Sequence, residues 1–425
     1  MQLSFNQTTA YQFIAHFVAL MLVYAAATLL GAVKFLGADP LAASLPYSQV
    51  AQFADAVLLL ALISGVIGGG LISSDLVNIS FPDERLLRYT RRAWTLLCLL
   101  TVGAGILGLL AGRAGLALPP FLALAFALLI ALVLFVVVRV LPRWSGTAFV
   151  WAVGMTAILI GTVIGLLPAD AAHSPLLGVI AVALRDHLGI GLGVIALIFW
   201  QMGRFSTLAT DRIERGLYRT AGLWSLGVML LTLQPLYALG VTTPMIAGVV
   251  GLPLIMAIFA AHVFPAFGAG SQARSQSPLW VGLALSLLFT GVGIVGAINA
   301  LPDVNLMIAG TRLTDLARTL VLLAFAAALF GMVTAEIRPE GRHTLGAAAF
   351  WLIGVGALGI TLGLGAAGIV QVYLERLLSV GYLETQTLII PLYTLWVIGW
   401  LAAALGLVGF ALDFWTRRAS PLEST

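Results

Sequence analysis

VAQFADAVLLLALISGVIGGGLISS, residues 50–74, is an almost uninterrupted apolar run with a single charged side chain, Asp55. A helix rises about 1.5 Å per residue, so a run of this length can cross the roughly 30 Å of hydrocarbon in a bilayer. Its glycine cluster at 65–70 is typical of helices whose backbones approach their neighbours closely. The stretch therefore predicts a transmembrane helix packed among others.

Similar runs recur along a chain that is 61% hydrophobic and only 9% charged. Soluble domains are about 25% charged, so this composition indicates an integral membrane protein. The breaks are short, which predicts an all-α fold with a single transmembrane helical domain over residues 1–425. We count about twelve spans, at 11–37, 50–74, 92–111, 119–141, 146–168, 179–203, 217–239, 242–266, 279–301, 306–334, 346–373 and 388–414.

Basic residues gather in every second break between these spans. The even-numbered breaks hold Arg85, Arg88, Arg91, Arg92, Arg139, Arg143, Arg204, Arg212, Arg215, Arg219, Arg274, Arg338, Arg342, Arg417 and Arg418; the odd-numbered breaks hold little beyond Lys34, Arg113 and Arg376. The positive-inside rule then places both termini in the cytoplasm, and we expect a prokaryotic cytoplasmic (inner) membrane. Topology and anionic lipid account for these arginines, so no nucleic-acid partner is expected.

Charged side chains also occur inside the predicted spans, where they are costly and often functional. By the predicted orientation six of them lie in the outer third of the bilayer: Asp55 in the second span, Arg185, Asp186 and His187 in the sixth, and Asp315 and Arg318 in the tenth. One interpretation is two neutralising pairs, Arg185 with Asp186 and Asp315 with Arg318. A ligand or proton site and a subunit contact are the alternatives.

His187 has no obvious partner for metal binding. His16 and His262 lie toward the cytoplasmic ends of other spans, and Cys98 is the only cysteine. Because metal and haem sites need several ligands at one depth, we expect a hydrogen-bonded structural histidine beside Asp186, with a lone metal ligand as the alternative. No resident cofactor is expected.

From the sixth span onward the chain resembles the catalytic subunit of C-family (cbb-type) haem–copper oxidases and the related nitric oxide reductases. The similar stretches are LRDHLGIG at 184–191, FWQM at 199–202, LYR at 217–219, FWLIG at 350–354, AGIVQ at 367–371, YLE at 382–384 and PLY at 391–393. The resemblance implies the twelve-span bundle of cytochrome c oxidase subunit I and an oxidoreductase activity that uses two haems and copper. It places His187 on a copper-ligating histidine.

The same resemblance implies that the other ligands are lost. Phe53 stands at the haem-ligand position of the second span, and Leu316 and Arg318 replace the histidines of a His-x-His pair in the tenth. The seventh span, around 234–237, lacks its pair of copper-binding histidines. We therefore expect a pseudo-oxidase, in which Phe53 occupies part of a haem cavity and Arg318 reaches Asp55.

Such a chain would be a non-catalytic subunit of a membrane electron-transport complex, with a role in assembly, in docking other subunits, or in forming a quinone or lipid cleft. One alternative is an active haem-binding terminal oxidase or nitric oxide reductase subunit with unusual ligation. A further alternative is a member of the related nitric-oxide-response membrane proteins, which also have many spans and bind haem. A secondary transporter or proton channel is another, although the halves show no inverted repeat.

Overall fold

The computed structural model describes residues 5–36, 45–73, 84–110, 120–138, 145–166, 174–232, 243–269, 276–337 and 344–418, and these ranges contain helices and no strand. The helices are α1 (Phe5–Val33), α2 (Tyr47–Ser73), α3 (Glu84–Leu110), α4 (Pro120–Val138), α5 (Gly146–Gly165), α6 (Ser174–Val182), the π-helical η3 (Ala183–Ile190), α7 (Gly191–Phe205), α8 (Thr210–Thr232), α9 (Thr243–Gly268), α10 (Ser277–Leu288), the π-helical η5 (Phe289–Gly296), α11 (Ala297–Asn299), α12 (Pro302–Ile308), α13 (Arg312–Ile337), α14 (Thr344–Val372), the π-helical η6 (Tyr373–Leu377), α15 (Tyr382–Leu388) and α16 (Ile390–Arg418).

Within these ranges, 10 helical stretches are long and apolar enough to cross a membrane: Thr9–Val33, Tyr47–Ser73, Arg88–Leu109, Gly146–Gly165, Leu177–Phe205, Met245–Gly268, Ser277–Asn299, Arg312–Ala335, Leu345–Leu377 and Ile390–Thr416. Each coincides with a predicted span, so the all-helical membrane fold is confirmed. The fourth predicted span overlaps α4, whose apolar stretch Ala125–Leu134 is shorter. The seventh begins in α8, and its residues 233–239 lie outside the described residues.

The tenth span begins later than predicted, at Arg312 instead of residue 306. The preceding residues form the separate short helix α12, and the chain turns at Gly310, whose φ is 78°. Glycine adopts this left-handed conformation without a steric penalty. The backbone N–H of Arg312 then donates to Gln371 Oε1 on α14 at 3.3 Å. The new helix therefore starts where a neighbouring helix satisfies one of its free N–H groups.

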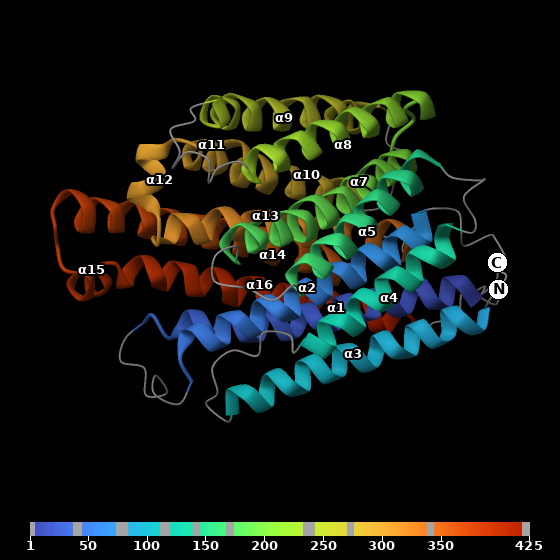
Figure 1. The fold of residues 1–425 in the computed structure, drawn as a ribbon, viewed down its shortest axis with the longest axis horizontal. Helices are drawn as coiled ribbons and strands as arrows, with labels where there is room; N and C mark the ends of the chain where they lie inside the picture. Colours follow the sequence, from blue (N-terminus) through green and yellow to red (C-terminus); the bar gives the residue numbers. More distant parts are fainter. Residues whose placement is uncertain are drawn as a thin grey trace.

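The long helices lie side by side, and Figure 1 shows the two chain termini at the same end of the bundle. The short helices α12 and α15 lie at the opposite end. A chain that enters and leaves at one end crosses the bundle an even number of times. Which side of the membrane that end faces stays a prediction.

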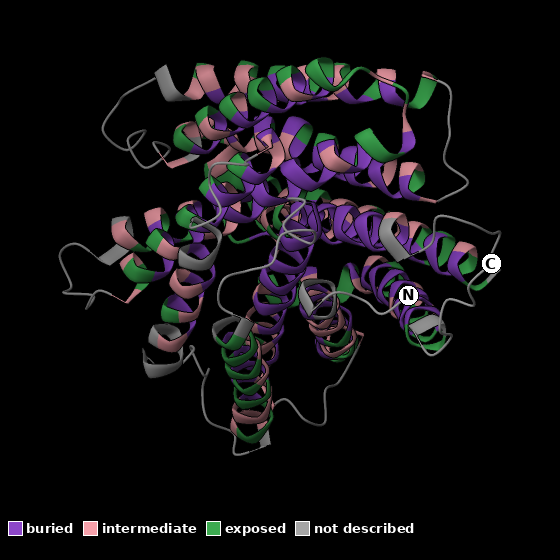
Figure 2. Ribbon diagram, turned by 90° about the vertical axis from the view of Figure 1, so that its right-hand side faces the viewer, coloured by how far each residue is buried: buried purple, intermediate pink, exposed green. Residues whose placement is uncertain are grey.

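Buried residues gather in the middle of the bundle, as Figure 2 shows, and α2 is the most completely buried of the spans. Its glycine cluster at 65–70 faces α13, α1, α7 and α5 in turn. A Cβ atom on Gly70 would lie 2.0 Å from the ring of Trp151, whose Nε1 donates to Val66 O at 2.8 Å. The prediction that these glycines permit close helix packing is confirmed.

Candidate functional site

Charged side chains from three helices line a cavity of about 300 Å³ between α2, α5, η3 and α13, which we call the α2–η3 cavity. Asp55 comes from α2, Arg185 and Asp186 from η3, and Arg318 from α13. Thr162 of α5 is a further polar residue of the lining. The structure thus brings together four of the six residues that the sequence placed at one depth, while His187 and Asp315 are not in this lining.

Arg318 and Asp55 form an ion pair between α13 and α2. Arg318 Nη1 donates to Asp55 Oδ2 at 2.9 Å, so the predicted pairing of these residues is confirmed. The alternative pairing of Arg318 with Asp315 is wrong, because Asp315 Oδ2 accepts instead from Arg312 Nη1 at 2.8 Å. Arg312 lies one turn before Asp315 on α13, and contacts to other helices hold it there.

Arg185 and Asp186 pair with each other, as predicted. Arg185 Nε donates to Asp186 Oδ1 at 2.6 Å and its Nη2 donates to Oδ2 at 3.2 Å. Neighbouring residues of a regular helix do not face one another, and this pair lies in the π-helical segment η3, a kind of distortion that is frequent at functional sites. A Cβ atom on Gly161 of α5 would lie 2.7 Å from the backbone nitrogen of Arg185, so glycine is what allows η3 to approach α5.

His187 is half-buried in η3, and its backbone oxygen accepts a hydrogen bond from Trp224 Nε1 at 2.9 Å. Across the described part of the chain, no three His, Cys, Asp or Glu side chains gather in a way that could hold a metal ion. Asp186, which we expected beside His187, accepts a hydrogen bond from Arg185. Among the described residues, the side chains around His187 therefore do not fit a copper centre.

Phe53 does not occupy space between the second and tenth spans, and that prediction is wrong. Its ring lies on Gly105 of α3, where a Cβ atom would be 2.3 Å from Phe53 Cδ2. Residues two apart on a helix are about 200° apart around its axis, so Phe53 and Asp55 face nearly opposite sides of α2. The apolar Phe53 side chain also offers no lone pair to a haem iron.

Leu316 and Arg318, the replaced residues of the tenth span, likewise face different helices. Leu316 is buried toward Gly365 of α14, whereas Arg318 reaches α2. The leucine has no donor atom, and the guanidinium remains protonated. At the three positions where the resemblance expects haem ligands, the residues present do not fit a haem.

A second cavity of about 380 Å³, the α1–α16 cavity, has the Asp55–Arg318 pair in its lining as well. It is formed by the C-terminal part of α1 and the N-terminal parts of α2, α13 and α16, toward the α12 and α15 end in Figure 1. Asp55 and Arg318 line both cavities. The two cavities therefore meet at this ion pair, with Leu322 also in both linings.

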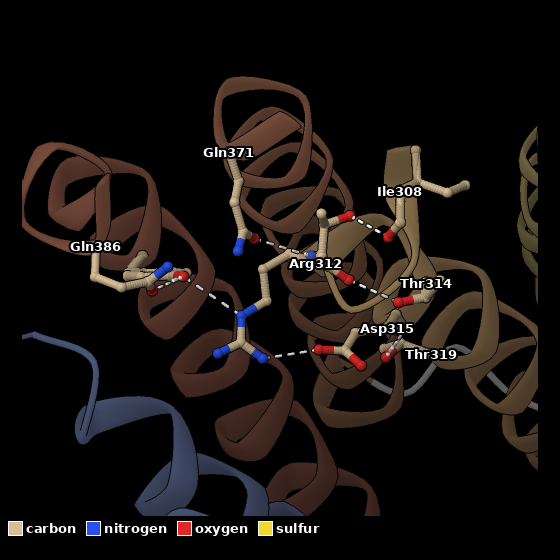
Figure 3. A network of polar contacts seen from close by, with 9 residues as sticks. Ile308, Arg312, Thr314, Asp315, Thr319, Gln371 and Gln386 are labelled. Atoms are coloured by element: carbon tan, nitrogen blue, oxygen red, sulfur yellow. Dashed lines mark hydrogen bonds and ion pairs between the residues drawn. The ribbon is translucent and has the colours of Figure 1, made fainter. Parts of the chain in front are cut away.

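Arg312 organises the wall of the α1–α16 cavity, and sequence reasoning missed it. Figure 3 shows its guanidinium between Asp315 and the N-terminal end of α16. Nε donates to Tyr393 Oη at 3.4 Å, and that hydroxyl donates to Gln386 Oε1 at 2.7 Å. The Arg312 Cζ atom lies 4.4 Å from the ring centroid of Phe35 on the segment that follows α1. The spacing of three residues between Arg312 and Asp315, soon after Gly310, indicates an ion pair within one helix and could have identified Arg312.

No protein-family model matches the chain, and no curated protein matches it. The resemblance to haem–copper oxidases therefore stays a prediction from the residues quoted for it, and function is inferred below from the geometry of the two cavities.

Proposed function

We propose that the chain is a non-catalytic, oxidase-like integral membrane subunit of an electron-transport complex that works without haem or copper. The observation that carries the proposal is the ion pair of Arg318 Nη1 with Asp55 Oδ2, at 2.9 Å. It joins the second and tenth spans, the two helices that a haem would bridge in the similar family. A protonated guanidinium cannot ligate iron, and its neutralisation by a carboxylate favours a structural role for both residues.

We further propose twelve spans with both termini in the cytoplasm. The helices α4 and α8 supply the two spans beyond the ten long apolar stretches. The common end of the two termini in Figure 1 supports an even number of crossings. The exposed arginines Arg85, Arg88, Arg212 and Arg215 support the cytoplasmic side, because basic residues are retained there.

The test is purification of a tagged chain in mild detergent, followed by a pyridine haemochrome spectrum, copper analysis and identification of co-purifying subunits. We expect haem and copper far below one per chain, together with subunits that carry redox centres. The same membranes with the tag on an unrelated polytopic protein are the control. One haem per chain would contradict the proposal and favour an active oxidase or nitric oxide reductase subunit.

A proton channel or transporter is the second candidate, and a different observation favours it. Two cavities share one ion pair in their linings, so a change in that pair could alter the path from one cavity to the other. Proteoliposomes with a trapped pH-sensitive dye would measure proton flux for the wild type, Asp55→Asn and the control Asp303→Asn on α12. A channel predicts a proton flux that Asp55→Asn abolishes and Asp303→Asn leaves unchanged. A wild-type flux no greater than that of empty liposomes would exclude the channel.

A further inference from the structure

Three charged side chains inside the spans remain accessible. The side chains of Asp55, Asp315 and Arg318 are 42%, 51% and 55% exposed. They lie within the apolar stretches Tyr47–Ser73 and Arg312–Ala335. Because hydrocarbon cannot solvate an exposed charge, a polar medium must reach these side chains inside the membrane.

The two cavities provide the space for that medium. All three side chains line the α1–α16 cavity, and Asp55 and Arg318 line the α2–η3 cavity as well. Along α2 the combined lining extends from Tyr47, the first residue of the helix, to Leu62. At about 1.5 Å per residue this distance is about 22 Å, more than half of the roughly 30 Å of hydrocarbon in a bilayer. The cavities thus lead from the α12 and α15 end deep into the bundle.

Toward the other end, the described residues of the same helices are closely packed. Residues 60–73 of α2, 191–199 of α7 and 324–334 of α13 are all buried. A Cβ atom on Gly65 would lie 2.6 Å from Leu329 Cδ1, and the backbone at Gly69 is equally close to α7. Packing of this kind leaves no room for water. The helices α2, α7 and α13 therefore close the cavities on the side of the termini.

The lining requires an occupant that both donates and accepts hydrogen bonds. The bond to Asp55 uses one of the five side-chain N–H donors of Arg318. The hydroxyls of Thr28, Thr314 and Thr319 donate to backbone oxygens at 2.9, 2.7 and 2.7 Å, so their own oxygen atoms are left to accept. Water supplies both donors and acceptors, whereas a lipid tail supplies neither.

We propose that the two cavities form one water-filled crevice, which enters the bundle at the α12 and α15 end and is closed toward the end that holds the termini. The ion pairs of Arg312 with Asp315 and of Arg318 with Asp55 leave its lining without net charge, which favours water over an ion of either sign. The crevice gives small hydrophilic molecules on one side of the membrane access to Asp55. This inference goes beyond the proposed function and does not require the absence of haem.

The first test is the reaction of single cysteines with a membrane-impermeant cationic methanethiosulfonate, in the full chain reconstituted in lipid nanodiscs. Cys98 is the only cysteine and is buried, so Cys98→Ala supplies the cysteine-free parent. Thr319→Cys places a thiol in the lining of the α1–α16 cavity, and Ala56→Cys places one in the lining of the α2–η3 cavity. Complete labelling of each variant after unfolding in dodecyl sulfate confirms that its thiol is intact.

The control Leu362→Cys lies at the depth of Thr319 on the outer surface of the bundle. The antiparallel helices α13 and α14 meet at Leu313 and Gly368, and Thr319 and Leu362 are each six residues from that contact in the same direction along the bundle. Leu362 is 52% exposed and lines neither cavity. Since the reagent attacks thiolates, which form in contact with water, we expect the two lining variants to react at least about tenfold faster than Leu362→Cys. Equal rates would overturn the proposal.

The closed end is tested by adding the reagent to one face of the membrane at a time, in spheroplasts and in inverted vesicles. Asp303→Cys, at an exposed position of α12, marks the face on which the crevice should open. Thr319→Cys should react only from the face from which Asp303→Cys reacts. Reaction from both faces, or from the opposite face alone, would overturn the proposal.

Hydroxyl-radical footprinting of the wild type gives an answer that does not depend on how the variants fold. Leu322 lines both cavities, so radicals formed from water should oxidise Leu322 and spare the lipid-facing Leu362. A protected Leu322 would overturn the proposal. The haem spectrum of the same preparation decides the proposed function separately: haem together with an oxidised Leu322 would refute the non-catalytic role and keep the crevice, and a haem-free protein with a protected Leu322 would do the reverse.

Discussion

The Asp55–Arg318 pair should behave as one energetic unit. Each side chain is about half accessible, 42% for Asp55 and 55% for Arg318. A lone charge at the centre of a membrane helix costs roughly 3 kcal/mol, and with half of each side chain accessible we take about half of this, about 1.5 kcal/mol, as the cost of leaving one partner unpaired. Asp55→Asn and Arg318→Gln should each lose about that much free energy of unfolding.

The double variant removes both charges and should cost about 1 kcal/mol or less, because no unpaired ion is left. The resulting coupling energy is about 2 kcal/mol. Equilibrium unfolding in mixed detergent micelles with increasing dodecyl sulfate, followed by circular dichroism, would measure all four corners of the cycle. Asp303→Asn, an exposed acid at the same end of the bundle, is the control and should change the free energy by less than about 0.5 kcal/mol.

Additive effects in this cycle, within about 0.3 kcal/mol, would refute the reasoning. They would mean that each residue is solvated independently and that the ion pair does not join α2 to α13. A double variant that loses more free energy of unfolding than the two single variants together would contradict the pairing as well.

Three further predictions use the same unfolding assay or the haem spectrum. Arg312→Lys keeps the charge but loses the planar guanidinium that bonds both Tyr393 and Asp315, so it should lower the free energy of unfolding by about 1–2 kcal/mol. The control Arg376→Lys, at an exposed site, should lower it by less than about 0.5 kcal/mol. Equal losses in the two variants would contradict the special role of Arg312. Gly70→Ala places a Cβ atom 2.0 Å from the indole ring of Trp151 and should lower the free energy of unfolding by about 3 kcal/mol. In the control Gly103→Ala the new Cβ atom meets nothing within 4 Å, so this variant should be neutral or slightly stabilising. A neutral Gly70→Ala would contradict the prediction and show that the ring can move away. Phe53→His should not recruit haem, since position 53 faces α3; a haemochrome signal in that variant alone would contradict the orientation of α2.

Apolar run length predicted the spans well. Every one of the ten long apolar helices falls on a predicted span, because a bilayer requires about 20 consecutive apolar residues in a helix whatever its neighbours are. The start of α13 was not predictable in this way. It depends on the Gly310 turn and on Gln371, a residue about 60 positions away that reaches the first N–H of the helix.

The side chain that each charge contacts was only partly predictable. The pairing of Arg185 with Asp186 was predictable, because the two residues are adjacent in the sequence and remain close in any fold. Asp315, in contrast, lies within three residues of both Arg312 and Arg318, and the local sequence favours neither. The choice depends on α2, which offers Asp55 to Arg318, and on Tyr393 and Phe35, which hold Arg312 beside Asp315.

The sequence alone determined that this is an all-helical membrane protein with opposite charges at one depth of the spans, because hydrocarbon thickness and charge cost act on each segment separately. Only the tertiary structure decided that Phe53 faces α3, that Arg318 pairs with Asp55, and that this pair lines two cavities. These features depend on how each helix is rotated about its own axis. In a bundle that rotation is set by packing between spans distant in sequence, such as glycine against indole at Gly70 and Trp151.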